Sequence, residues 1–177
     1  MAIASPEQRK AADPRQSVWV SANAGAGKTT VLTGRVVRLL LAGADPSRIL
    51  CVTFTKAAAA NMQNRVFERL GEWVALDNDA LAQAIEELTG EPPRPDDIPR
   101  ARRLFARAVE TPGGLKIQTI HGFCERLLHS FPFEAAVPAR FKVLDESEQR
   151  EATEAAITAT LHAALKEPDG PLGEALA

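Results

Sequence analysis

The ten residues SANAGAGKTT, Ser21 to Thr30, constrain the fold of this chain more than any other stretch. They lie between a short apolar run, Val18 to Val20, and residues whose apolar side chains recur with helical spacing. Small residues there would let backbone N–H groups converge on phosphate oxygens, and the N-terminus of the following helix adds positive potential. The stretch therefore predicts a phosphate-binding loop between a strand and a helix. A simple tight turn is the alternative, but it would not need a lysine followed by two threonines.

The predicted loop departs from the general phosphate-loop pattern at one position, because Ala22 stands where the first glycine is expected. The chemistry is kept: Lys28 would reach the β- and γ-phosphates of a nucleotide, and the Thr29 hydroxyl would bind Mg²⁺. Lys28 and Thr29 are thus the predicted catalytic residues, and Thr29 is the predicted metal ligand. The other predicted nucleotide-binding positions of the loop are Ala22, Asn23, Ala24, Gly25, Ala26, Gly27 and Thr30.

Predicted strands and helices alternate in the first part of the chain. The pattern predicts a helix over 5–12, a buried strand over 17–20, a helix over 28–41, a buried strand over 49–54 and a helix over 55–70. This order favours an α/β fold with a parallel sheet. Further along, we expect a helix over 77–89, a proline-rich connector, a helix over 101–110, a strand in LKIQTI, a short helix in HGFCERLLHSF and a long helix up to Lys166.

Composition limits the kinds of partner. Lys and Arg number 21 against 23 Asp and Glu, a net charge of −2, so a nucleic-acid partner has to be argued from local residues. Only two cysteines occur, which argues against a disulfide scaffold and indicates a reducing compartment. No apolar run approaches the length of a membrane span, and the first residues lack a secretory pattern. We expect a cytoplasmic protein with no membrane partner.

Three segments carry a resemblance to a known family. ILCVTFTKAAAANM resembles the segment that follows the phosphate loop in UvrD-like superfamily 1 DNA helicases, and TIHGFCERLL resembles the family's next motif. Gln8 matches the glutamine that reads adenine in that family. An alanine at the first loop position is usual there, so Ala22 supports the resemblance. One departure is Asn61, since the family helix usually carries glutamate before the position of Met62.

The resemblance covers roughly residues 5–75 and 115–150, and TIHGFCERLLHSFPFEAAVPARFKVLDE is most similar to AddA-like helicase–nuclease subunits. It implies a P-loop NTPase with a partial RecA-like parallel sheet and a helical insertion, using ATP and Mg²⁺. The partners that it implies are single-stranded and double-stranded DNA and an AddB-like subunit, in double-strand break repair and recombination. The chain would be the amino-terminal part of such a helicase, inactive in unwinding by itself.

The resemblance further divides the chain into four parts. Residues 1–75 would be the P-loop half of RecA-like domain 1A, and 76–112 a helical, proline-rich insertion. Residues 113–135 would return to the RecA-like domain, and 136–177 would begin an inserted helical subdomain of the 1B type.

The predicted DNA-binding residues follow two of the strands. Thr53, Phe54, Thr55 and Lys56 come at the carboxyl end of one strand, where parallel sheets place ligands, and an aromatic ring there can stack on a base. Thr119 and His121 bracket the exit of another strand. Two alternatives stay open: Phe54 is the last buried residue of its strand, or His121 is a capping or packed residue. The family resemblance favours the DNA-binding role for both.

Two other patterns imitate functional sites. FKVLDE resembles an acidic Mg²⁺-binding strand, but Lys142 interrupts it, and Asp145 with Glu148 equally predicts a helix cap. A self-contained P-loop module or small kinase using Asp145 and Glu146 is the alternative function. A third is a nucleotide-gated interaction domain that docks partners on its proline-rich middle. His121, Cys124 and His129 share one short helix, for which an amphipathic helix is the simpler interpretation than a metal site.

Overall fold

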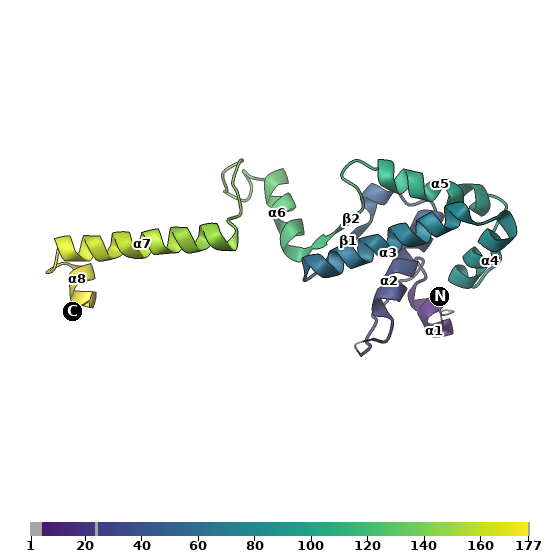
Figure 1. Ribbon diagram of the computed structural model, residues 1–177, viewed down its shortest axis with the longest axis horizontal. Helices are drawn as coiled ribbons and strands as arrows, with labels where there is room; N and C mark the ends of the chain where they lie inside the picture. The colour runs from purple at the N-terminus through teal and green to yellow at the C-terminus, as the bar shows by residue number, and fades with distance from the viewer. Residues whose placement is uncertain (1–4, 24, 177) are drawn as a thin grey trace. The chain divides into compact units, whose positions relative to one another are not determined.

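The computed structural model describes residues 5–23 and 25–176, and the chain divides into a first unit, Met1–Cys124, and a second unit, Glu125–Ala177. The first unit contains α1 (Pro6–Ala11), α2 (Lys28–Leu41), the short 3-10 helix η1 (Pro46–Arg48), β1 (Leu50–Thr53), α3 (Lys56–Ala75), α4 (Asn78–Thr89), α5 (Asp97–Glu110) and β2 (Lys116–Thr119) (Figure 1). The unit boundary falls within α6 (Ile120–Ser130), and the second unit holds α7 (Glu146–Lys166) and α8 (Pro171–Leu176).

Two parallel strands form the sheet of the first unit. β1 pairs with β2 in a register that runs from Leu50 opposite Lys116 to Thr53 opposite Thr119. Helix α3 packs against both strands, so one face of the sheet is covered (Figure 1). On the other face Leu50 and Val52 are exposed. The predicted α/β order and the parallel pairing are therefore confirmed, whereas the prediction that this strand is buried is wrong for one of its faces.

Residues 17–20 do not form the predicted buried strand. This segment has no regular secondary structure, and the Trp19 side chain is 92% exposed. A strand is stable only where its N–H and C=O groups pair with a neighbouring strand. In the part of the chain that the structure describes, the sheet consists of β1 and β2, and neither pairs with residues 17–20. The apolar run Val18 to Val20 therefore stays open to solvent.

The hydrophobic core of the first unit is made mainly by four helices. Its fully buried members include Val37 and Leu40 of α2, Val66, Leu70 and Trp73 of α3, Leu81 and Ile85 of α4, and Ala101 and Leu104 of α5. Helices α4 and α5, which come from the predicted insertion 76–112, thus pack into the same core as the helix that follows the phosphate loop. The four-part division of the chain itself stays a prediction.

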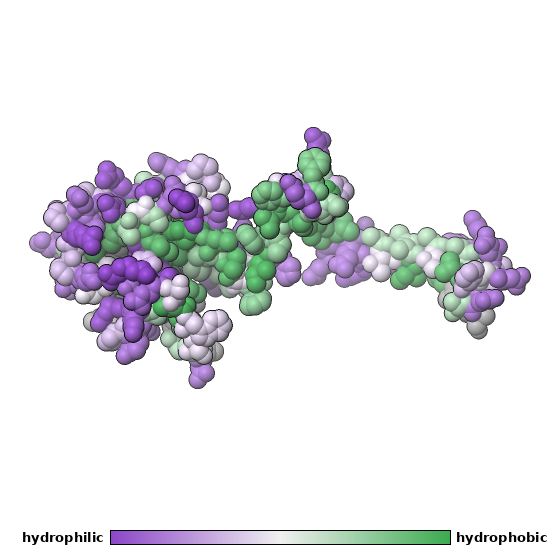
Figure 2. Space-filling model, turned by 180° about the vertical axis from the view of Figure 1, so that it is seen from behind, coloured by the Kyte–Doolittle hydropathy of each residue, from purple (hydrophilic) through white to green (hydrophobic). Residues whose placement is uncertain are grey.

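The second unit is dominated by α7. Asp145 caps this helix: its carboxylate accepts hydrogen bonds from the N–H groups of Ser147 and Glu148, each 2.9 Å long. Glu148 completes the capping box by accepting from the Asp145 N–H at 3.1 Å. Apolar side chains such as Ile157 and Leu165 lie exposed along α7, and green patches mark this helix in Figure 2. Within the described residues, no helix combines the length and apolarity needed to cross a bilayer.

Candidate functional site

The phosphate-binding loop has the backbone that its glycines permit. Gly25 and Gly27 adopt φ values of 81° and 83°, in the left-handed region that disfavours residues with a Cβ atom. Gly27 is the N-cap of α2 and offers no side chain to the first turn of that helix. The N–H groups of this turn therefore lack intrahelical partners and are suited to binding an anion. Ala24, one of the predicted loop residues, lies outside the described residues.

Lys28 folds back over the loop. Its ammonium group donates to the carbonyl oxygen of Ala22 and, at 2.6 Å, to that of Asn23. Since an ammonium group has three hydrogens, it can also donate to a phosphate oxygen at the same place. Thr29 and Thr30 are exposed in the first turn of α2, where a hydroxyl can reach a metal ion bound to phosphates. Lys28 and Thr29 thus fit the predicted binding of a nucleotide with Mg²⁺.

Gln8 lies beside this loop, although it comes from a different helix. A methyl group in place of the Gly27 hydrogen would lie only 2.9 Å from Gln8 Nε2. The amide is also part of the cap of α1: Gln8 Oε1 accepts from the Ser5 N–H at 3.0 Å, and Ser5 Oγ accepts from the Gln8 N–H at 3.2 Å. The structure therefore brings together the predicted adenine-reading residue and the predicted phosphate loop.

The end of β1 presents the predicted DNA-binding aromatic residue to solvent. The Phe54 side chain is 84% exposed, so the alternative that it is the last buried residue of the strand is wrong. Thr55 is the N-cap of α3, and its hydroxyl accepts from the Ala58 N–H at 3.1 Å. Thr53 ends the strand and Lys56 begins the helix. An exposed ring beside a capped helix N-terminus can stack on a base and approach its phosphate.

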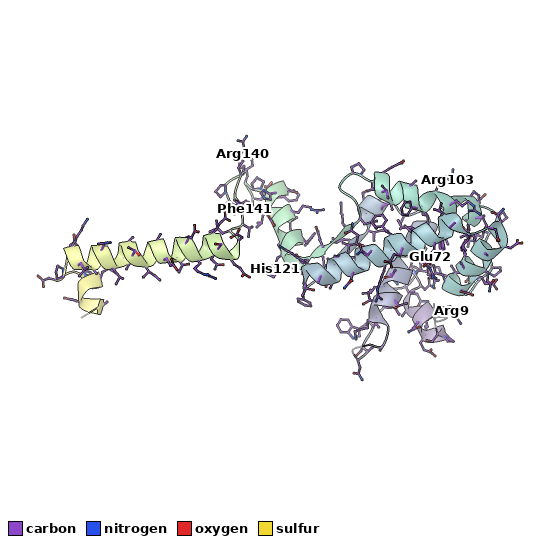
Figure 3. The ribbon with its side chains drawn as sticks, viewed as in Figure 1. Arg9, Glu72, Arg103, His121, Arg140 and Phe141 are labelled. Atoms are coloured by element: carbon purple, nitrogen blue, oxygen red, sulfur yellow. The ribbon has the colours of Figure 1, made fainter. Side chains whose placement is uncertain are left out.

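The end of β2 lies next to that of β1. Thr119 is opposite Thr53 in the parallel register, and its hydroxyl accepts from the Gly122 N–H at 3.0 Å. His121 is exposed in the first turn of α6, where β2 passes into the helix (Figure 3). The hydroxyl of Thr119, rather than the histidine ring, caps this turn. Both groups of predicted DNA-binding residues therefore meet at the carboxyl edge of one sheet.

Three charged residues that the sequence interpretation did not single out tie α2 to the segment before the loop. Arg38 donates to the Arg9 carbonyl oxygen at 2.8 Å and lies 3.7 Å from the Asp13 carboxylate. Arg35 donates to the Asp13 carbonyl oxygen at 2.6 Å. Hydrogen bonds from Arg15, helped by Arg38, lower the pKa of Asp13 from 3.8 to about 2. Two arginines three residues apart on an otherwise apolar helix were the sequence signal for this arrangement.

A cavity of about 300 Å³ lies between α1, α2, α3 and α4. Gln8 and Thr30 line it near the phosphate loop, and Arg9 of α1 and Glu72 of α3, both labelled in Figure 3, line it elsewhere. Its wall also includes Thr33, whose buried Oγ1 has no hydrogen-bond partner among the residues described. The cavity separates part of α1 from the helices that it faces.

The alternative sites gain no support from the structure. Residues 141–145 carry no strand, and Asp145 is engaged in the cap of α7. The His129 ring stacks on Phe141, with centroids 4.2 Å apart, and its Nε2 lies 4.0 Å from Glu125. Among residues 5–23 and 25–176, no three His, Cys, Asp or Glu side chains are grouped as metal ligands would be.

Comparison with known proteins adds independent information. Residues 4–169 match the family described as UvrD/REP helicase N-terminal domain. The chain is 34% identical over 137 residues to the ATP-dependent helicase/nuclease AddA subunit of Enterococcus faecalis, covering 77% of this chain and 9% of that protein. It is 35% identical over 176 residues to the protein of the same name from Limosilactobacillus fermentum, covering 93% of this chain and 11% of the relative. The chain thus spans about a tenth of the length of these relatives.

Proposed function

Because the chain belongs to the UvrD/REP helicase family, through the N-terminal domain of that family, we propose that it is the ATP-binding part of an ATP-dependent DNA helicase of the AddA helicase/nuclease type. In this proposal the whole protein translocates on single-stranded DNA in double-strand break repair and recombination, in the cytoplasm, together with an AddB-like subunit. The names of the relatives, which describe a subunit of a helicase/nuclease, support this assignment.

The first unit is proposed to bind ATP through the phosphate loop. Backbone N–H groups at the start of α2 and the ammonium group of Lys28 would hold the β- and γ-phosphates. Mg²⁺, bound by the Thr29 hydroxyl and by phosphate oxygens, would neutralise the charge that develops on the transferred group. Gln8 would read the adenine base, since a carboxamide offers one donor and one acceptor to the adenine edge.

The observation that carries the DNA-binding part is the exposed Phe54 ring at the carboxyl edge of the sheet. Its neighbours Lys56 and His121 are also exposed and can contact phosphates or bases from the adjoining helix N-termini. A base stacked on Phe54 would be held without regard to its identity, because every base has an aromatic face. This is the kind of contact that a translocating motor requires.

Fluorescence anisotropy with a labelled oligothymidine, at low and moderate salt and with or without ATP and Mg²⁺, tests this proposal. We expect Phe54→Ala to weaken binding by about tenfold, which is the contribution of one base–aromatic stack. Phe133→Ala is the matched control, since Phe133 is 88% exposed but lies in the second unit. Equal affinity of wild type and Phe54→Ala in folded proteins would refute the assigned DNA contact.

The same preparation separates the proposal from the kinase-like alternative. We expect these 177 residues to bind ATP without unwinding a duplex, because helicase action needs a second RecA-like lobe that closes on the nucleotide. Processive unwinding by this chain would contradict that expectation. ATP hydrolysis that is lost in Asp145→Asn, with no affinity for single strands, would instead favour the small P-loop enzyme.

A further inference from the structure

We propose that Arg38, Arg35 and Asp13 are positioning residues that hold Gln8 beside the phosphate loop, so that the preference for adenine depends on them. This inference rests on the proposed function of Gln8 and Lys28 and adds residues that contact neither base nor phosphate. Arg38 is ten positions beyond Lys28, about 15 Å along α2. It would therefore act on nucleotide recognition only through the segment that carries Gln8.

Apolar packing alone holds α1 weakly. The helix has six residues, none of them buried, and a helix of that length is not stable by itself. Beside it lies the cavity of about 300 Å³ lined by Gln8, Arg9 and Ala12. Ala12, which follows α1, is buried, and a methyl group on Gly34 of α2 would lie 3.8 Å from its Cβ. This single close apolar contact does not fix the position of the helix along α2.

Polar contacts from α2 supply what packing lacks. Arg38 donates from Nη1 to the Arg9 carbonyl oxygen at 2.8 Å, which lies one residue beyond Gln8. Arg35 donates from Nη1 to the Asp13 carbonyl oxygen and from Nη2 to the Gln16 carbonyl oxygen, both at 2.6 Å. Two guanidinium groups on successive turns of α2 therefore bind carbonyl groups spread over residues 9–16. Such planar, multiple donors fix orientation as well as distance.

Asp13 locks this arrangement in place. Asp13 and Arg38 are only 7% and 8% exposed, so each charge needs its partner inside the protein. The carboxylate of Asp13 is also bound by Arg15, with Nε to Oδ1 at 3.0 Å and Nη2 to Oδ2 at 2.9 Å. Asp13 thus joins the end of the α1 segment to α2 through Arg38. The register of Gln8 against Gly27 follows from these contacts, because α1 is short and continuous with Asp13.

The decisive measurement compares fluorescent ATP and GTP analogues, with tripolyphosphate as a probe that has no base. In wild type we expect ATP to bind more tightly than GTP, because guanine presents acceptors where adenine presents a donor and an acceptor. Arg38→Met, like Gln8→Ala, should reduce the GTP-to-ATP ratio of dissociation constants by about fivefold, the effect of one lost hydrogen bond. The affinity for tripolyphosphate should stay within about twofold of wild type, since it depends on Lys28 and the loop.

Controls separate positioning from a loss of folding. Arg103→Met is the matched substitution, because among the described residues Arg103 of α5 donates to the Pro99 carbonyl of its own helix (Figure 3). Where Arg38→Met alone fails to fold by circular dichroism, the double variant Asp13→Asn with Arg38→Met removes both buried charges together. Arg38→Lys should restore part of the selectivity, as it keeps the charge but not the fork of donors.

The outcomes distinguish this inference from the proposed function. Loss of selectivity in Gln8→Ala but not in folded Arg38→Met, or in the double variant, overturns the positioning role and leaves nucleotide binding intact. ATP bound by wild type without preference over GTP also overturns it. If wild type binds neither ATP nor tripolyphosphate, the proposed nucleotide site itself fails, and the inference fails with it.

Discussion

Asp13 shows how one side chain links charge to stability in the first unit. It is buried next to Arg38, and two hydrogen bonds from the Arg15 side chain bind its carboxylate. Burial alone would raise the pKa of this carboxyl group, but the guanidinium groups outweigh it and lower the pKa from 3.8 to about 2. The ionised form is therefore the one that the folded protein stabilises.

This shift predicts an acid-dependent loss of stability. Because the pKa of Asp13 is lower in the folded than in the unfolded chain, its contribution is fully present above pH 4 and is lost as the pH falls towards 2. Asp13→Asn should lower the free energy of unfolding at pH 6 and flatten its decline between pH 4 and 2. Urea unfolding followed by circular dichroism across this range measures both, with exposed Glu110→Gln as control. An unchanged pH slope in Asp13→Asn would contradict the assignment.

Residue roles were predictable where the local sequence carried the signal. The glycines with positive φ and the lysine of the phosphate loop could be recognised from ten residues. For Phe54 the sequence left burial and exposure open, and its 84% exposure depends on which neighbours the fold brings to the end of β1. Arg38 was missed because its partners, Arg9 and Asp13, lie more than twenty residues away along the chain.

At the scale of elements, helix ends agree closely with the sequence because their caps are local. The predicted helix over 28–41 has those bounds, and the helix over 77–89 ends at the predicted Gly90, whose φ is 79°. The capping box of Asp145 and Glu148 is confirmed as well. The apolar pattern of α2 was less reliable: Val36 and Leu40 are buried, but Leu32 is exposed.

The N-cap of α3 leads to a prediction about this element. Thr55 accepts from the Ala58 N–H, so Thr55→Ala should reduce the free energy of unfolding by about 1 kcal/mol, as loss of an N-cap does. Thr55→Ser retains a hydroxyl and should stay near wild type. Chemical denaturation of the three proteins provides the measurement. If alanine and serine variants are equally stable, the hydroxyl does not stabilise the first turn of α3.

At the scale of the whole molecule, the first unit is held by a core that its middle segment helps to build. Leu81 and Ile85 of α4 and Leu104 of α5 are fully buried with Trp73 of α3. The proline-rich connector between α4 and α5 could be recognised in the sequence, but not the packing of the helices on either side of it. Each of these helices also stands between the two strands of the sheet in the chain order.

The core predicts that the middle segment is needed for the stability of the site. Leu81→Ala should reduce the free energy of unfolding by about 2–5 kcal/mol, because it leaves a cavity among packed side chains. Val109→Ala on α5 is the control, since Val109 is exposed and its truncation should change stability by less than about 0.5 kcal/mol. Equal urea midpoints for the two variants would show that α4 contributes little to the fold.

The sequence by itself determined the phosphate loop, the order of strands and helices, and most helix ends, because each depends on residues close together in the chain. Only the tertiary structure decided that Thr53 and Thr119 lie side by side, that Gln8 meets Gly27, and that Arg38 is buried against Asp13. It also decided that residues 17–20 remain unpaired. Burial and strand pairing depend on partners distant in sequence, and a local pattern does not contain their positions.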